Sequence, residues 1–434
     1  MSSELVTPGA NARAMERVVM SFAIGLKCRE CGDTYPAEAR FVCEQCFGPL
    51  EVDYDLVAAK GEVTRESIAA GPASIWRYAA LLPDPGTTPV DLGAGWTPLR
   101  RADRLGALLG LKELYLKDDT RNPTGSFKDR VVSVALSSAR RLGFTTAACA
   151  STGNLATSVA AHAAAIGWPS VTVIPSDLES SKVAMTAIFG GTVLAVNGSY
   201  DDVNRLCAEL VSEHPDWAFA NVNLRAYYAE GSKTLAFEIA EQLGWRTPDQ
   251  VVVPVASGSQ LTKIAKGFRE FEELGLTDGP TPRLFGAQAA GCAPIATALR
   301  EGANVVRPVR PNTIARSLAI GNPADGPYVL DEVRRGGGDI GSVSDDEVLE
   351  CISLLARTEG IFAETAGGVT IASLRQLIAR GSIDVNRPVV AIISGHGLKT
   401  LDAVVDTARV TATISPSLAE AEAALTAHHS EVLS

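Results

Sequence analysis

The chain has 434 residues, of which 46% are hydrophobic, 21% charged and 6% aromatic, a composition typical of a globular protein with room for two or three domains. Its net charge of -11 argues against nucleic acid and against anionic membrane surfaces as partners. Because no apolar run approaches the roughly 18 residues of a spanning helix, we expect no membrane partner and a cytoplasmic location.

Two cysteine pairs lie near the start of the chain. Cys28 with Cys31, and Cys43 with Cys46, each form a Cys-x2-Cys knuckle. Four thiolates at this spacing match a tetrahedral zinc site without an open position, which favours a structural zinc over a disulfide framework or a catalytic metal. We expect the apolar residues 18–26 to form the strand that enters this module, not the core of a signal peptide.

After the cysteine pairs, the chain has a connector and then a long region in which predicted strands and helices alternate. Residues 56–95 are rich in proline and predict a connector with one short helix. From residue 96 onward, β-branched runs alternate with amphipathic stretches, which predicts parallel sheets covered by helices. The expected strands are residues 145–150, 170–174, 192–196, 250–255, 284–287 and 389–393. The expected helices are residues 155–165, 202–213, 230–243, 344–357 and 370–378.

Residues 117–130 read KDDTRNPTGSFKDR, and Lys128 is the most informative residue in this run. It follows a strand-like segment at 114–116 and a turn-forming loop at 122–125, and it opens a predicted helix. Free backbone N–H groups and the positive end of the helix dipole favour the neutral amine that a Schiff-base lysine needs. On this motif alone, a surface lysine entering an ordinary helix is an equally good interpretation.

Three further loops follow predicted strands, where open parallel sheets bind their ligands. Residues 151–154 (STGN) offer hydroxyls and backbone donors to an anion, although Ser, Thr and Asn are also ordinary N-caps. Residues 256–260 (ASGSQ) suit a cofactor monophosphate, because small side chains let backbone N–H groups surround it, and their glycine spacing excludes a P-loop. Residues 394–397 (SGHG) allow a ligand to approach closely, and His396 is expected to be structural.

In this order the lysine and the three loops resemble the fold-type II pyridoxal-phosphate enzymes, over roughly residues 95–405. Among these, the chain is most similar to the threonine synthase family. The runs that carry the resemblance are WTPL (96–99), PTGSFKDR (123–130), STGN (151–154), EGSKT (230–234), EGIFAETAGG (359–368) and SGHGLK (394–399). The resemblance implies an α/β fold of two parallel-sheet domains, like the tryptophan synthase β chain, plus a small N-terminal zinc-ribbon-like module.

The resemblance also implies a division of the chain, and a homodimer as its assembly. The expected parts are an N-terminal arm with the four-cysteine module (1–55), a connector (56–95), a large cofactor-binding domain (96–144 plus 235–410), a small domain (145–234) and a helical or disordered tail (411–434).

Residue roles follow from the same resemblance. Lys128 would bind pyridoxal 5'-phosphate as a Schiff base and then transfer protons. Asn154 would bind the cofactor 3-hydroxyl, and Ser394 would face the pyridine nitrogen. The cofactor phosphate would bind to Ser257, Gly258 and Ser259. The substrate carboxylate would bind to Ser151, Thr152 and Asn154, and the substrate phosphate to Ser126, Lys182, Asn223 and Arg225.

The implied reaction converts O-phosphohomoserine and water to L-threonine and phosphate by γ-elimination and β-addition. Two departures from the family pattern keep sister activities open: residues 256–260 lack the usual glycine- and asparagine-rich sequence, and Arg225 stands at an unusual spacing before residues 230–234. These sister activities are cysteate synthase, threonine or serine dehydratase, and diaminopropionate synthase. A non-catalytic metal-sensing or regulatory protein on the same scaffold is the interpretation from a different class.

Overall fold

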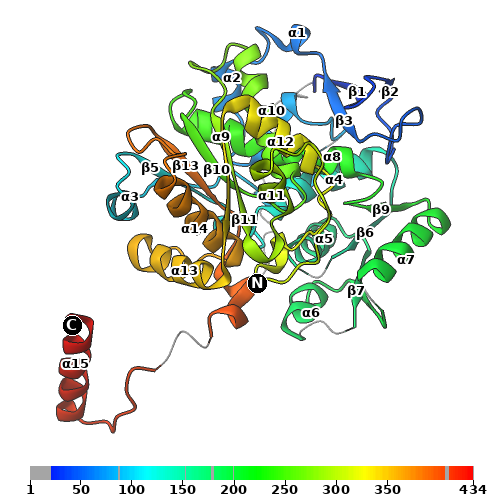
Figure 1. Cartoon of the computed structure of the whole chain (residues 1–434). Coiled ribbons are helices and arrows are strands. Elements are labelled where there is room, and N and C mark those ends of the chain that lie inside the picture. Colours follow the sequence, from blue (N-terminus) through cyan, green and yellow to red (C-terminus); the bar gives the residue numbers. More distant parts are fainter. Residues whose placement is uncertain are drawn as a thin grey trace, which may run out of the picture.

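The computed structural model describes residues 21–86, 88–151, 153–176, 180–198, 200–405 and 410–433. Within these residues the chain forms three sheets (Figure 1). One sheet is parallel throughout, and a second is parallel except for one strand at its edge; both are covered by helices. The third sheet belongs to the cysteine-containing module. The predicted α/β fold with two parallel-sheet domains and a small N-terminal module is confirmed.

The largest sheet has the strand order β12-β11-β10-β13-β5-β4, and only β4 and β5 pair antiparallel. Its strands are β4 (Leu99–Arg101), β5 (Leu114–Asp118), β10 (Gln250–Pro254), β11 (Arg283–Ala289), β12 (Ile340–Val343) and β13 (Val389–Ile393). Val251 and Val253 pack into one hydrophobic core, whereas Val252 packs into another. The sheet is therefore buried on both faces, which explains its continuous apolar strands.

The second sheet has the order β8-β7-β6-β9 and is parallel throughout. Its strands are β6 (Thr146–Ala150), β7 (Ser170–Pro175), β8 (Thr192–Val196) and β9 (Trp217–Phe219). The helices are α1 (Leu56–Ala59), α2 (Arg65–Ala69), α3 (Asp103–Leu109), α4 (Lys128–Arg141), α5 (Asn154–Ala165), α6 (Ser180–Ala187), α7 (Tyr200–Glu213), α8 (Arg225–Glu230), α9 (Thr234–Gln242), α10 (Ser259–Glu273), α11 (Pro294–Arg300), α12 (Gly326–Gly336), α13 (Asp345–Glu359), α14 (Thr365–Ala379) and α15 (Leu418–Leu433).

The termini of the described chain lie outside the two main sheets. The module sheet is antiparallel and consists of β1 (Ala23–Cys28), β2 (Thr34–Tyr35) and β3 (Leu50–Tyr54). Of the strand expected at 18–26, residues 18–20 lie outside the described residues, and the strand itself begins at Ala23. Helix α15 stands apart from the body in Figure 1. No described helix has both the length and the apolar character needed to span a bilayer.

Two expectations about helices are wrong in detail. The connector holds two short α-helices, α1 and α2, instead of one. The helix expected at 230–243 is interrupted by a 3-10 turn at Gly231–Lys233, after which α9 begins. At Gly231 a β-carbon would lie 2.5 Å from the carbonyl oxygen of Arg130. The close approach of this turn to α4 therefore requires glycine.

A buried ionic network fixes the beginning of α4. The guanidinium of Arg130 is fully buried between two carboxylates, since Nη2 lies 2.8 Å from Asp119 and 2.9 Å from Glu238. Lys117 Nζ lies 2.6 Å from Glu238 as well. Burial by itself would raise the pKa of Glu238, but Arg130 and Lys117 outweigh it and lower that pKa to about 2. The network holds the helix start in one position.

This network predicts a loss of stability in acid. Because the pKa of Glu238 is depressed on folding, its contribution is present above pH about 4.5 and is lost as the pH falls towards about 2. The free energy of unfolding should fall in this window, by up to about 1.4 kcal/mol per pH unit for each such group. Urea unfolding at pH 6, 4 and 3 tests this, and an equal free energy at all three would contradict it.

Candidate active site

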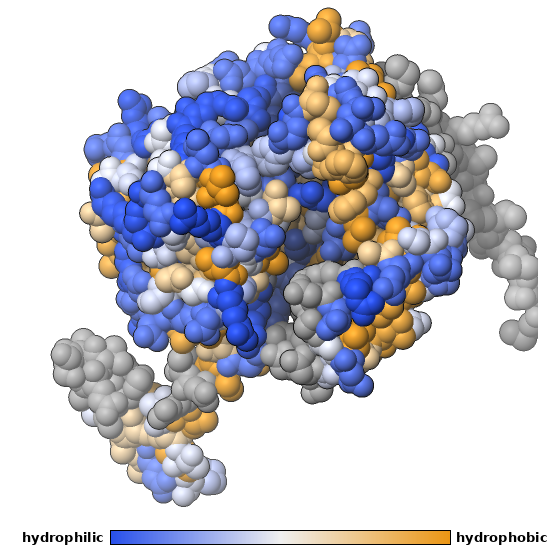
Figure 2. All heavy atoms as spheres, turned by 45° about the vertical axis from the view of Figure 1, so that its right-hand side comes forward, coloured by the Kyte–Doolittle hydropathy of each residue, from blue (hydrophilic) through white to orange (hydrophobic). Residues whose placement is uncertain are grey.

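A cavity of about 640 Å³ lies at the carboxyl ends of β6, β10 and β13, where parallel sheets bind their ligands. Figure 2 shows the molecule hollowed near the middle of one face. The predicted site residues that line the cavity are Lys128, Ser151, Asn154, Arg225, Ser257, Gly258, Ser259 and Ser394. Residues far apart in the sequence are thus brought to one place.

Lys128 is the first residue of α4, as its sequence context predicts. Its side chain is half-buried and lines the cavity, so it is not an ordinary surface lysine. The amine donates a hydrogen bond of 2.9 Å to the hydroxyl of Tyr228, a half-buried residue of α8. An amine and a phenol in direct contact can exchange a proton. Sequence reasoning missed Tyr228, whose one available signal is its position just before EGSKT.

Backbone hydrogen bonds join the loop before Lys128 to the SGHG turn. The N–H of Phe127 donates to the carbonyl of Ser394 (2.8 Å), and the N–H of His396 donates to the carbonyl of Gly125 (2.9 Å). The carboxylate of Asp129 accepts hydrogen bonds from Thr124, which closes the loop from its other side. His396 Nδ1 accepts the N–H of Leu398, a contact that supports the expected structural role.

The small-residue loop after β10 has the geometry of an anion site. Ser259 begins α10, a helix of 15 residues whose first N–H groups lack intrahelical partners. Gly258 has φ +104°, and a β-carbon there would lie 2.6 Å from Val329 Cγ2. Only glycine fits this position without strain. The loop thus presents backbone donors to the cavity at a helix N-terminus.

Glu364 is a cavity residue that sequence reasoning did not single out, although it lies in the quoted run EGIFAETAGG. Its carboxylate accepts a hydrogen bond of 2.8 Å from Asn154 Nδ2 and one of 3.0 Å from Ser394 Oγ. Burial raises the pKa of Glu364, and the hydrogen bonds from Asn154 and Ser394 partly offset that rise. A β-carbon at Gly395 would lie 2.6 Å from this carboxylate, which explains the first glycine of the SGHG turn.

Lys399 is a second lysine of the cavity, and sequence reasoning assigned it no role. Its Nζ is buried and has no hydrogen-bond partner among the described residues. Burial lowers the pKa of Lys399, while the nearby carboxylates of Glu364 and Asp129 act in the opposite direction. An unpaired buried amine is costly, so its presence suits a site that receives an anionic group.

Comparisons with known proteins agree with this geometry. Residues 90–395 match the family described as pyridoxal-phosphate dependent enzyme. The threonine synthase of Methanosarcina acetivorans is 41% identical over 88% of this chain and 93% of its own length. That of Methanocaldococcus jannaschii is 40% identical over 87% of this chain and 94% of its own length. The chain belongs to the threonine synthase family of pyridoxal-phosphate-dependent enzymes.

The fold of this threonine synthase family member is also that of more distant enzymes. Maize serine racemase superposes with a TM-score of 0.61 over 72% of this chain and 92% of its own, at 22% identity. The processed form of threonine deaminase isoform 2 from Solanum lycopersicum gives 0.59 over 72% of this chain and 88% of its own, at 22% identity. Similarity at this level of identity supports the fold alone.

The cavity of this family member fits the cofactor on observations of its own. It holds a lysine amine for the aldehyde, and an anion-binding loop built around Gly258 for the phosphate. Gln260 Nε2 and Lys399 Nζ are buried polar atoms without partners among the described residues, and both residues line the same cavity. These groups suit a ligand that carries a phosphate and a hydroxyl group on its ring.

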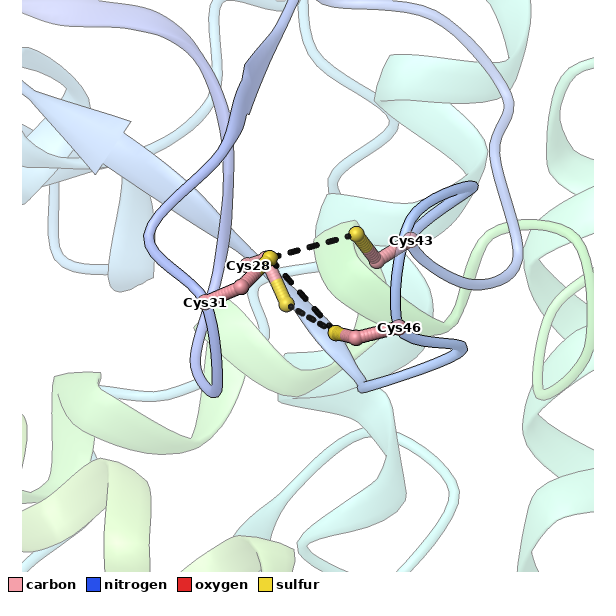
Figure 3. A group of neighbouring side chains, drawn as sticks. All are labelled: Cys28, Cys31, Cys43 and Cys46. Carbon is pink, nitrogen blue, oxygen red and sulfur yellow. Dashed lines mark hydrogen bonds between the residues drawn. The ribbon is translucent and has the colours of Figure 1, made fainter.

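The four knuckle cysteines converge on one point, as Figure 3 shows. Their sulfur atoms all lie within 4.8 Å of one another, and those of Cys28 and Cys46 are 3.4 Å apart. Zn–S bonds of about 2.3 Å in a tetrahedron place sulfurs about 3.8 Å apart, close to this arrangement. The donor set therefore fits a tetrahedral ion bound through sulfur.

Four predicted substrate-binding residues are not among the described residues that line the cavity. Ser126 is buried in the loop before Lys128, and its hydroxyl accepts from the N–H of Lys128 at 3.4 Å. Asn223 donates to the carbonyl of Trp217 and does not line the cavity. Thr152 lies outside the described residues, and Lys182 is in α6 with a side chain that the structure does not describe. Their roles stay predictions.

Replacing Gly258 by alanine should weaken cofactor binding. Alanine at this positive φ and in contact with Val329 would force the loop away from its present shape. The dissociation constant of pyridoxal phosphate should therefore rise about tenfold or more. Absorbance titration of the cofactor-free protein measures this. Gly336→Ala is the matched control, because a β-carbon there meets no atom closer than 3.7 Å. Equal affinities in the two variants would contradict the assignment of the loop.

Proposed function

We propose that the chain is a threonine synthase that converts O-phosphohomoserine and water to L-threonine and phosphate. The observation that carries the proposal is a lysine amine, an anion-binding loop and the Ser394–Glu364–Asn154 cluster in one cavity of a chain about 40% identical to threonine synthases. Bound pyridoxal phosphate would supply the electron sink that stabilises negative charge at the substrate α-carbon.

Each residue has a task in this proposal. Lys128 holds the cofactor and moves the substrate protons, and Tyr228, 2.9 Å from its amine, supplies or accepts a proton at that nitrogen. Ser257, Gly258 and Ser259 hold the cofactor phosphate at the start of α10. Ser394 faces the ring nitrogen with a hydroxyl that is oriented by Glu364. Asn154 is held by the same carboxylate towards the cofactor 3-hydroxyl.

Positively charged side chains around the cavity are evidence for a substrate that carries two negative charges. Arg225, Arg316 and Lys399 line it, although Arg225 also pairs with Asp325 at 2.9 Å. We assign Lys399 Nζ to a substrate anion, because it is buried without a partner among the described residues. Ser151 and the start of α5 remain the candidates for the substrate carboxylate.

The net reaction is balanced without an oxidant or reductant. The Cγ–O bond breaks, and the phosphate leaves and takes a proton from water. The hydroxyl of the same water bonds to Cβ, while a proton is lost from Cβ and another is gained at Cγ. Residues that shuttle protons are therefore as necessary as residues that bind the phosphate.

The experiment that tests substrate choice compares phosphate release from O-phosphohomoserine and from O-phosphoserine, each with and without sulfite. Threonine and phosphate should form in equal amounts from O-phosphohomoserine alone. Release that occurs only from O-phosphoserine and requires sulfite would assign a cysteate synthase instead. The substrate decides between these sister activities because contacts in the cavity, not the fold, set specificity.

We also propose a structural zinc on Cys28, Cys31, Cys43 and Cys46, a homodimeric assembly and a cytoplasmic location. The sulfur geometry and the full set of four protein ligands support zinc. The purified chain should contain about one zinc per polypeptide.

A further inference from the structure

The four-cysteine module (residues 21–55), called the zinc module below, lies against α10, which begins at the cofactor-phosphate loop, and against α12. In Figure 1 it lies beside α10 and α12. Glu51 of β3 forms an ion pair of 2.9 Å with Lys263 of α10, and the carbonyl of Val52 accepts from Lys266 at 2.7 Å. The buried carboxylate of Glu230 binds Lys263 as well, at 2.6 Å. Helix α10, which begins at the phosphate loop, is thus attached to the module along its first two turns.

The first knuckle makes a second attachment, to the start of α12. Arg29, between the two cysteines, lies 3.6 Å from Asp325 and stacks on the ring of Tyr328 at 3.8 Å. The hydroxyl of Tyr328 donates to Glu30, the next residue of the knuckle. The position of Arg29 depends on the knuckle itself, because the N–H of Glu30 donates to Cys28 Sγ and the N–H of Gly32 to the carbonyl of Cys28.

The start of α12 in turn touches the phosphate loop. The N–H of Asp325 donates to the carbonyl of Ser257 at 2.9 Å. An added β-carbon at Gly258 would lie 3.0 Å from Asp325 and 2.6 Å from Val329. The first turn of α12 therefore lies between the metal knuckle and the loop and contacts both.

We propose that the zinc knuckle positions the cofactor-phosphate loop through Arg29 and Asp325, so that zinc occupancy controls how tightly the chain holds pyridoxal phosphate. Arg29 is a positioning residue, since it is not among the described residues that line the cavity. It also adds a positive charge beside Asp325, whose carboxylate lies at the wall of the anion site and otherwise pairs, among the described residues, with Arg225. Both effects favour a bound phosphate. The inference rests on the cofactor and zinc of the proposed function, but not on its substrate.

The test measures the affinity of the full-length, cofactor-free chain for pyridoxal phosphate by absorbance titration. Arg29→Gln should raise the dissociation constant about fivefold, since it removes a partly exposed ion pair and a cation–π contact. Arg29→Lys, which keeps the charge, should recover part of this loss. Arg40→Gln is the matched control. Arg40 pairs with Glu38 and Glu44 within the module, and this variant should have the same dissociation constant as the parent chain.

Zinc removal completes the test. Chelation should weaken cofactor binding of the parent chain by about tenfold or more, and should weaken the Arg29→Gln variant by a smaller factor. Zinc content and far-UV circular dichroism confirm that Arg29→Gln keeps its module. If that variant loses zinc, Tyr328→Phe, which leaves the module sequence intact, should raise the dissociation constant about twofold.

Unchanged cofactor affinity in Arg29→Gln, or in the zinc-free parent chain, would overturn the proposal. Where Tyr328→Phe is used instead, unchanged affinity in that variant would overturn it too. The titration contains no substrate, so its result does not depend on which substrate the chain uses. If cofactor affinity changes as expected but the chain does not act on O-phosphohomoserine, only the proposed function is refuted.

Discussion

Lys128→Ala is expected to lower turnover by roughly a thousandfold or more and to abolish the visible absorbance of bound cofactor. The Lys128 amine lies in the cavity, 2.9 Å from Tyr228, at the start of α4. Lys399, the other lysine of the cavity, lies near the carboxylates of Glu364 and Asp129. Since its Nζ is assigned to a substrate anion, we expect Lys399 not to take over the role of Lys128. Absorbance spectra and phosphate release measure the two effects.

Lys112→Ala is the control for this experiment, because Lys112 is exposed and lies outside the cavity. It should keep both the spectrum and the rate. The same comparison separates the enzyme from a metal-sensing protein on an inactive scaffold. A parent chain that binds no cofactor, or a Lys128→Ala variant with full turnover, would favour the second interpretation.

Arg130→Met is expected to destabilise the protein by about 3–5 kcal/mol, because it leaves buried carboxylates without their partner. Arg130 is fully buried and binds Asp119 through two nitrogens, each at 2.8 Å. It also binds Glu238, which then has only Lys117 as a cationic neighbour among the described residues. Urea unfolding followed by tryptophan fluorescence measures the loss. The backbone N–H of Trp96 donates to Glu238, so one tryptophan lies beside the network.

Arg375→Met is the matched control for the buried network. Arg375 pairs with Glu350, whose side chain is 58% exposed, so the expected loss is only about 0–1 kcal/mol. Equal losses in the two variants would show that the network around Arg130 does not stabilise the start of α4.

Local sequence patterns predicted most of the scaffold and the parts of the site that sit on single loops. Three parts of the site could be predicted because each lies where a strand is followed by a helix and has characteristic residues: Lys128, the STGN loop and the ASGSQ loop. Such junctions fall at one edge of a parallel sheet. The cysteine spacing predicted the convergence of four sulfurs.

Contacts between distant segments could not be predicted in this way. Glu364 and Asn154 are 210 positions apart, and Tyr328 and Glu30 are 298 apart. Neither pair has a local signature, since each depends on how whole elements pack. The close contact at Gly231 could not be predicted for the same reason, because it depends on the backbone of α4 and not on the local sequence.

The most direct test of the proposed function uses O-phosphohomoserine in water labelled with heavy oxygen. Threonine should carry the label in its hydroxyl, and the phosphate, released by cleavage of the Cγ–O bond, should carry none. Labelled phosphate together with homoserine would show simple hydrolysis of the ester, and would contradict a threonine synthase that acts through Lys128.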